Sequence, residues 1–124
     1  MKINLLNLFI CPELFFIEQQ KKNLQKFCEE NNYQFLKQTV EKDNHEKILN
    51  FLKQELYTNS FFFIKKFIFI QNISVLFKNK NIDLVFFNNY WDKPRNDIII
   101  YLVETKENDF PPNINQKIKN FFYI

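Results

Sequence analysis

The sequence predicts a single α/β domain built around a parallel sheet, and three observations predict it. Residues 67–70 and 98–103 are almost entirely β-branched or aromatic, which is typical of strands buried on both faces of a parallel sheet. Segments with helical periodicity alternate with the expected strands, as right-handed crossover connections require. The chain has 124 residues, 46% of them hydrophobic, so one core of ordinary domain size can be buried.

The first strand and helix are expected on either side of Pro12. Residues 3–10 are mostly apolar and stop just before this proline, which predicts a strand. The helix that follows is expected to end at Asn31 and Asn32. Its buried stripe is expected to consist of Leu14, Ile17, Leu24, Phe27 and Cys28.

A second strand and helix are expected next. Residues 33–40 carry enough β-branched and aromatic side chains to predict the strand. Asp43 and Glu46 have the spacing of a capping box, which predicts the start of the helix. The buried face of this helix is expected to consist of Ile48, Leu49, Leu52 and Leu56.

The second half of the chain is expected to add the strands at 67–70 and 98–103 and two further helices. Residues 73–80 are interpreted as a connection. A third helix is expected over 82–91, with an inner face of Leu84, Val85, Phe87 and Trp91. Two prolines and Asn113 predict a short helix ending at 118, and 121–124 are expected to form a fifth, edge strand.

Composition excludes several classes of protein. The net charge of +3 is mild and the lysines are scattered, so a dedicated nucleic-acid binder is not expected and direct DNA affinity should be weak. No apolar run reaches the roughly 18 to 20 residues of a membrane span, and the start is too polar for a signal sequence, so the protein is expected to be cytoplasmic. Seventeen Phe and no Gly indicate AT-rich coding, so a phenylalanine alone is not a functional signal.

The expected ends of the strands lack nucleotide chemistry. A phosphate loop needs glycines and a Lys followed by Ser or Thr, but the first strand is followed by Cys11, Pro12 and Glu13. Gln71 and Asn72 follow the third strand, where a working P-loop ATPase carries carboxylates. We therefore expect no cofactor and no catalytic residue.

Other polar residues fit ordinary structural roles. The carboxylate pairs Asp92 with Asp97, and Glu104 with Asp109, are interpreted as solvated caps in loops. His45, the only histidine, lies beside first-turn carboxylates that the helix dipole explains, so no metal site is expected. The two cysteines, Cys11 and Cys28, have no ligand spacing and are expected to be small buried hydrophobes.

The segment before the third strand carries the strongest functional signal. Phe61 and Phe62 lie in an aromatic cluster that is followed by Lys65 and Lys66. Such a cluster either closes the edge of its own core or binds a pocket of another protein. Phe63, nearest the strand, is expected to be buried.

Several loose motifs then follow one another over almost the whole chain. They are a turn at 11–13, a Phe-Leu-Ile-Glu-like helix start at 15–18 and an aromatic segment at 59–62 with basic residues at 65–66. A strand with an Asn follows at 67–72, and a later strand at 98–103 has its loop at 106–109. In this order they resemble the amino-terminal domain of the delta subunit of the bacterial DNA polymerase III clamp loader. Two residues depart from that family's pattern, Cys11 for the usual turn glycine and Phe61 for a leucine.

The resemblance implies a P-loop-ATPase-like (AAA+-like) three-layer domain with a mainly parallel five-stranded sheet and a degenerate nucleotide site. It implies a non-catalytic clamp-loader domain that binds and helps to open the sliding clamp, the beta subunit, during DNA replication. The clamp-binding residues would be Ser60, Phe61, Phe62, Lys65 and Lys66. Other clamp-loader subunits would bind through regions absent here, and DNA only indirectly or weakly. Full-length members are larger, so we expect an excised domain or a truncated relative.

Two other classes stay open on the sequence alone. A small nucleic-acid-binding module would show DNA affinity that falls steeply with salt. A nucleotide- or metal-dependent phosphoryl-transfer enzyme or nuclease would be stabilised by its ligand. For Phe61 and Phe62 themselves, the alternative is packing under their own sheet.

Overall fold

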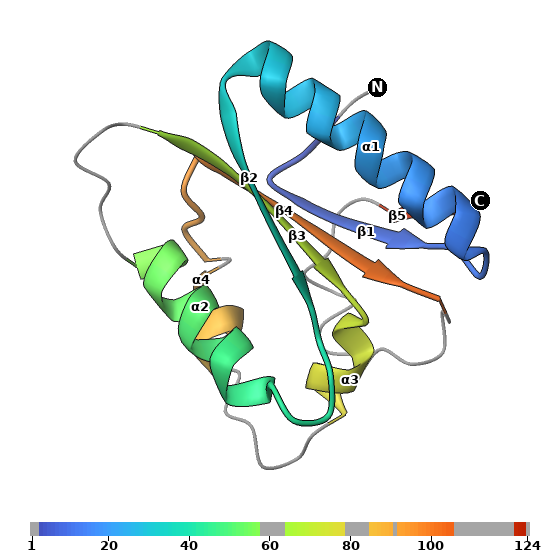
Figure 1. Cartoon of the computed structure of the whole chain (residues 1–124). Coiled ribbons are helices and arrows are strands. Elements are labelled where there is room, and N and C mark those ends of the chain that lie inside the picture. Colours follow the sequence, from blue (N-terminus) through green and yellow to red (C-terminus); the bar gives the residue numbers. More distant parts are fainter. Residues whose placement is uncertain (1–2, 58–63, 79–84, 91, 106–120, 124) are drawn as a thin grey trace.

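The structure, a computed structural model, describes residues 3–57, 64–78, 85–90, 92–105 and 121–123. Its elements, in chain order, are β1 (Leu6–Ile10), α1 (Leu14–Asn31), β2 (Tyr33–Thr39), α2 (His45–Tyr57), β3 (Lys65–Gln71), α3 (Ile73–Phe77), α4 (Val85–Tyr90), β4 (Ile98–Glu104) and β5 (Phe121–Tyr123). Figure 1 shows a sheet with helices on both sides. The predicted α/β class is confirmed.

The sheet is parallel and its strands follow the order β2-β3-β4-β1-β5. Strand β4 lies between β3 and β1 and buries all seven of its residues, because its apolar sequence can pack on both faces. The three-residue β5 pairs with β1 from Leu8 to Ile10. The four longer strands therefore form the part of the sheet that positions every feature considered below.

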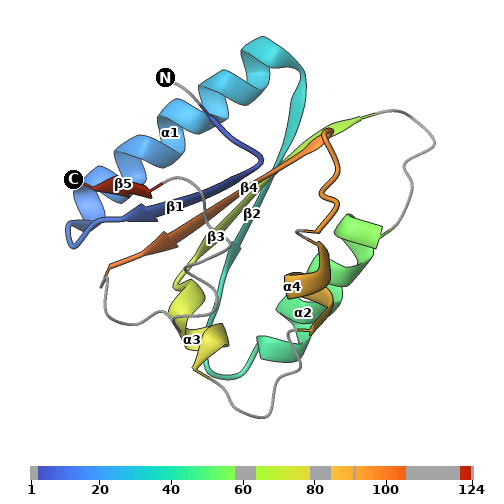
Figure 2. The same cartoon turned by 180° about the vertical axis from the view of Figure 1, so that it is seen from behind.

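The two faces of the sheet take alternate residues of each strand and carry different side chains. Figures 1 and 2 show α1 on one face and α2, α3 and α4 on the other. Even-numbered strand residues face the three helices, and the apolar ones are aliphatic: Leu6, Leu8, Ile10, Leu36, Ile68, Ile70, Ile98, Ile100 and Leu102. Odd-numbered residues face α1 and include the buried rings of Phe9, Phe67, Phe69 and Tyr101, with the partly buried Tyr33 and Phe35 packed against them.

Tyr101 is the centre of the aromatic face. Its ring stacks on Phe69 at a centroid distance of 5.9 Å and on Phe67 at 6.0 Å. Phe35 of β2 extends the layer, at 5.8 Å from each of the same two rings. The Tyr101 hydroxyl accepts a hydrogen bond from the Gln20 side chain of α1 at 3.0 Å, so the polar atom of this buried ring is satisfied.

Asparagine occupies turn positions that glycine usually occupies. The chain has no Gly, and among the described residues only Asn32 and Asn72 have positive φ, at 61° and 60°. Asn32 ends α1, as predicted, and its N–H bonds to the Cys28 carbonyl. Asn72 forms the turn from β3 into α3. Both positions use the tolerance of Asn for left-handed backbone.

The structure corrects several sequence predictions. Leu14 and Val85 were expected in the core but are 67% and 59% exposed, and each is the first residue of its helix. Helix α2 begins at His45, so Asn44 and not Asp43 precedes it, and the capping box expected from Asp43 and Glu46 is wrong. Residues expected to form a connection contain α3 (Ile73–Phe77). Leu84, Trp91 and the helix expected to end at 118 lie outside the described residues.

Substituting Phe69→Ala tests the aromatic face. Phe69 is fully buried, so its removal should lower the free energy of unfolding by about 3–5 kcal/mol. The matched control is Phe15→Ala, because Phe15 is 71% exposed and its loss should change stability by less than about 0.5 kcal/mol. Urea unfolding followed by circular dichroism measures both, and equal effects would contradict the assignment.

Candidate protein-binding site

The described residues on either side of the predicted clamp-binding segment are exposed. Ser60, Phe61, Phe62 and Phe63 lie outside the described residues. Before them, Tyr57 at the end of α2 is 56% exposed, and after them Ile64 is 41% exposed. The segment therefore leaves and rejoins the described structure at the edge of the sheet where strands begin, which we call the amino edge.

Lys65 is a solvent-exposed cation at this edge. It is the first residue of β3, and its side chain lies on the α1 face. Its Nζ atom lies 5.5 Å from the centroid of the Tyr33 ring. A cation–π contact at an exposed site contributes about 0.5–1 kcal/mol, so it orients the side chain but leaves its charge accessible to a partner.

Lys66 points the other way and is already paired. Its ammonium forms an ion pair with Glu55 of α2, and the two side chains are only 17% and 21% exposed. Its backbone N–H donates to the Asp97 carbonyl at 2.9 Å, next to the start of β4. Lys66 therefore fastens β3 to α2, and Lys65 is the more available of the two predicted basic residues.

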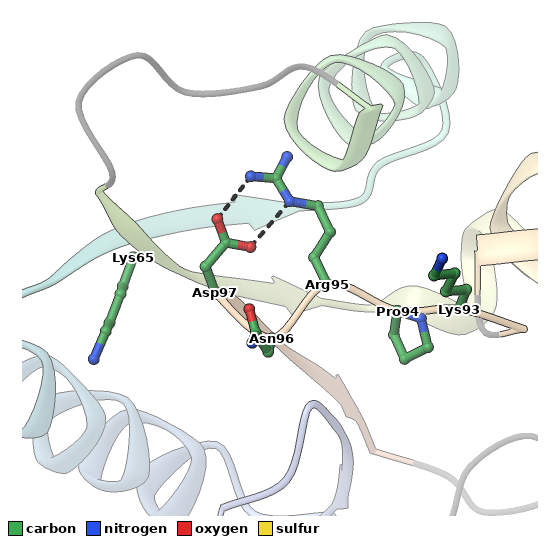
Figure 3. A pocket seen from close by; sticks show the side chains of 6 residues that line it. All are labelled: Lys65, Lys93, Pro94, Arg95, Asn96 and Asp97. Carbon is green, nitrogen blue, oxygen red and sulfur yellow. Dashed lines mark hydrogen bonds and ion pairs between the residues drawn. The ribbon is translucent and has the colours of Figure 1, made fainter.

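A shallow hollow of about 590 Å³ lies beside Lys65, and Figure 3 shows its lining. The lining residues are Lys65, Lys93, Pro94, Arg95, Asn96 and Asp97. Arg95 binds Asp97 through two hydrogen bonds of 2.9 and 2.7 Å. The hydrogen bond from Arg95 lowers the pKa of Asp97, and the same bond raises the pKa of Arg95.

The basic side chains around the hollow do not converge on one point. In Figure 3 the Lys65 side chain extends to one side of the sheet, whereas the Arg95 side chain extends to the other and meets Asp97. The hollow therefore suits the rim of a protein interface better than a site for one bound anion. The Arg95–Asp97 pair was not predicted from the sequence. The signal for it is that the only arginine lies two residues before an acidic residue.

The opposite edge of the sheet, where strands end, holds a buried carboxylate. Glu104 is 4% exposed, so the expectation that it is a solvated loop residue is wrong. It is the last residue of β4, and its Oε2 accepts the Ser74 N–H at 2.9 Å. Its Oε1 accepts the N–H of Thr105 at 2.8 Å and the hydroxyl of the same residue at 3.2 Å. These donors hold Glu104 as a structural link between β4 and α3.

The turn after β1 offers little to a phosphate. Cys11 is fully buried and its N–H donates to the Glu104 carbonyl at 2.9 Å, while Pro12 has no N–H. Glu13 precedes α1 and makes no side-chain capping bond. An acid at the start of the helix occupies the position that an incoming anion would need.

The remaining candidate residues have structural environments. Both cysteines are free and buried, as predicted, and burial raises the pKa of Cys28 to about 11. In the described part of the chain no three His, Cys, Asp or Glu side chains gather as metal ligands would. Within the same residues, no helix has the length and apolar character that crossing a membrane requires.

An exposed aromatic pair on α1 was missed by sequence reasoning. Phe15 and Phe16 in the first turn of α1 are 71% and 41% exposed and pack edge to face at 5.5 Å. Helical periodicity could have indicated them, because both lie off the stripe that contains Ile17 and Leu24. Their exposure makes them a useful reference for aromatic residues on the surface.

Compared with known proteins, the chain matches no protein-family model and no curated protein at a significant level.

Replacing Asp97 by Asn tests the Arg95–Asp97 ion pair through its pH dependence. The folded pKa of Asp97 lies below its ordinary value of 3.8, so the pair stabilises the fold above that value and is lost as pH falls through the folded pKa. Because the carboxylate is 33% exposed, the contribution should stay below about 1 kcal/mol. Urea unfolding from pH 7 to pH 3 should show the difference between wild type and Asp97→Asn shrinking toward acid pH, and a constant difference would contradict the assignment.

Truncating Glu104 tests the link between β4 and α3. Glu104→Ala leaves two backbone N–H groups without their acceptor and should cost about 2–3 kcal/mol in unfolding free energy. Glu18→Ala is the control, since Glu18 makes only an exposed contact of 3.8 Å with Lys21. Equal losses for the two variants, measured by urea unfolding, would show that Glu104 has no such role.

Proposed function

We propose that this chain is a non-catalytic clamp-loader domain of the DNA polymerase III delta-subunit type, which binds the sliding clamp and helps to open it during replication. The binding residues in this proposal are Ser60, Phe61, Phe62 and Lys65, with Lys66 supporting the strand that follows. The proposal includes the finer fold, a P-loop-ATPase-like (AAA+-like) three-layer domain with a mainly parallel five-stranded sheet and a degenerate nucleotide site.

One observation carries the proposal. The aromatic segment is flanked by Tyr57, which is 56% exposed, and by Ile64 and Lys65, which are exposed as well. A short segment whose ends are both at the surface can present Phe61 and Phe62 to a partner without disturbing the core. The core itself is already filled by other rings, with Phe67, Phe69 and Tyr101 each no more than 1% exposed.

The edge where strands end supports a non-catalytic role. In parallel α/β sheets, ligands bind outside the carboxyl ends of the strands. At this edge the chain places Pro12, the amide side chain of Asn72, and Glu104 with its oxygens already bonded to Ser74 and Thr105. Neither the nucleotide-dependent enzyme nor a metal-dependent nuclease is favoured by that arrangement. The diverging cations at the amino edge likewise do not favour a nucleic-acid-binding module.

The physical mechanism is anchoring by two aromatic side chains. A phenylalanine that enters a hydrophobic cleft buries on the order of 150–200 Å², and truncating such an anchor often costs ~2 kcal/mol or more. Lys65 at the rim would add electrostatic steering more than affinity. Binding opens the ring only if the open clamp is bound more tightly than the closed one, because equal affinity for both forms shifts nothing.

The double substitution Phe61→Ala with Phe62→Ala tests the proposal. Loss of two anchors should weaken binding to the cognate sliding clamp by at least about 30-fold, measured by surface plasmon resonance. The circular dichroism spectrum and melting temperature should stay close to those of the wild type.

Phe15→Ala with Phe16→Ala is the matched control, because it removes two aromatic side chains that are exposed on α1. This control should bind the clamp as the wild type does. Clamp binding that survives the first double substitution, or that both double substitutions weaken equally, would overturn the proposal.

A further inference from the structure

We propose that the ion pair between Glu55 and Lys66 positions the aromatic segment and raises the affinity for the clamp without touching the clamp. This inference rests on the proposed function, because it concerns how the same binding segment is held. It gives Lys66 a role other than that of a charge at the rim of the interface. It also adds Glu55, which was not predicted from the sequence.

The pair joins the two described elements between which the segment lies. Residues 58–63 connect Tyr57, the last residue of α2, to Ile64, which directly precedes β3. Glu55 lies in the last turn of α2, and Lys66 directly follows the first residue of β3. The contact between their side chains therefore links the two ends of the segment.

Each end is also held within its own layer of the fold. At the end of α2, Leu56 is 2% exposed, and the Tyr57 hydroxyl donates to the Phe86 carbonyl of α4 at 2.6 Å. At the start of β3, the Lys66 N–H donates to the Asp97 carbonyl at 2.9 Å. These contacts fix α2 against a helix and β3 within the sheet, whereas the ion pair fixes the two elements relative to each other.

The charges of this pair are partly shielded from water. The side chains of Lys66 and Glu55 are 17% and 21% exposed, whereas Glu18, in its ion pair with Lys21, is 55% exposed. Shielded charges attract each other more strongly than exposed ones, and removing one of them leaves the other in a place where hydration is reduced. Loss of either Glu55 or Lys66 should therefore release the two ends from each other.

Fixed ends favour binding because less order has to be created when the partner arrives. A segment loses conformational freedom when it binds, and holding its ends beforehand reduces that loss. When only a fraction of the molecules holds the ends in the binding geometry, the apparent dissociation constant rises by the inverse of that fraction. An ion pair of ordinary strength can change this fraction, and thus the affinity, by about two- to fivefold.

Two single substitutions separate positioning from direct contact. Glu55→Gln and Lys66→Met change the net charge in opposite directions, so a purely electrostatic contact with the clamp would change the affinity in opposite directions. Positioning instead predicts that both weaken binding of the 124-residue chain to the cognate clamp, each by about two- to fivefold in surface plasmon resonance.

Combined substitutions test whether the two residues act as one unit. Glu55→Gln together with Lys66→Met should weaken clamp binding no more than either change alone, because each already removes the whole contact. The reversed pair, Glu55→Lys with Lys66→Glu, should restore most of the lost affinity. Glu104→Ala is the control for lost stability, since it acts at the opposite edge of the sheet and should leave the clamp affinity unchanged.

Hydrogen exchange followed by NMR tests the same pair without the clamp. The amides of Leu56 and Tyr57 in α2 and of Lys66 in β3 should exchange about two- to fivefold faster in each single variant, because the ends open more often. The Asn32 amide, which bonds to the Cys28 carbonyl at the end of α1, should exchange as in the wild type.

The possible failures can be told apart. Unchanged exchange at Leu56, Tyr57 and Lys66 in both single variants would overturn the positioning role whether or not the clamp is bound. If Phe61→Ala with Phe62→Ala abolishes clamp binding but Glu55→Gln leaves it unchanged, the proposed function stands and the positioning role is wrong. Clamp binding that survives the loss of both phenylalanines would remove the proposed function and this inference together.

Discussion

The stacking of Tyr101 against Phe67 and Phe69 is the interaction on which the rest of this fold depends. These rings come from two adjacent parallel strands, and they all lie on the face covered by α1. Because strand side chains alternate between faces, a slip of one residue would move every ring to the aliphatic face. The aromatic layer therefore fixes the register of β3 against β4, and that register in turn determines which ends of the strands lie together at each edge.

Because the chain has no glycine, the positive φ angles among the described residues fall on asparagine. Asn32 and Asn72 follow α1 and β3, and each turns the chain into the next element. The turn after β1 uses Pro12 and a buried Cys11 instead, so its N–H groups are few and partly occupied. A sequence without glycine can still build the α/β scaffold, but it loses the close backbone approach that phosphate binding needs.

The pattern of apolar residues in the sequence predicted the strands that are buried on both faces of the sheet. It failed at the first residues of helices and for a helix that is short. The run from Ile98 to Val103 was predicted to be a strand and is one in the structure, because a central strand buries consecutive apolar residues. Leu14 and Val85 fit helical stripes but are exposed at the first residue of their helices, and periodicity alone does not show where a helix begins. The short α3 was missed because Ile73–Phe77 has too few residues to display a helical period.

The candidate sites were harder to predict because they depend on which strand ends lie side by side. Glu104 looks like a loop acid in the sequence, yet its neighbour Ser74 is 30 residues away along the chain. Lys65 and Lys66 are adjacent in sequence, but strand alternation sends them to opposite faces, one toward Tyr33 and the other into an ion pair with Glu55. The alternation of side chains along a strand could have predicted that the two lysines point to opposite faces. Predicting the residues that they contact would have required knowledge of the strand order.

The two edges of the sheet have opposite chemical character. At the edge where strands end, the Glu104 carboxylate already accepts hydrogen bonds from Ser74 and Thr105, so it is held in place and has few free lone pairs for a substrate or a metal. At the amino edge the Arg95–Asp97 pair stiffens the entry to β4, and Lys65 remains exposed beside it. The amino edge therefore combines a fixed strand start with an accessible cation, and the proposed function would use this edge as the polar rim of a protein interface.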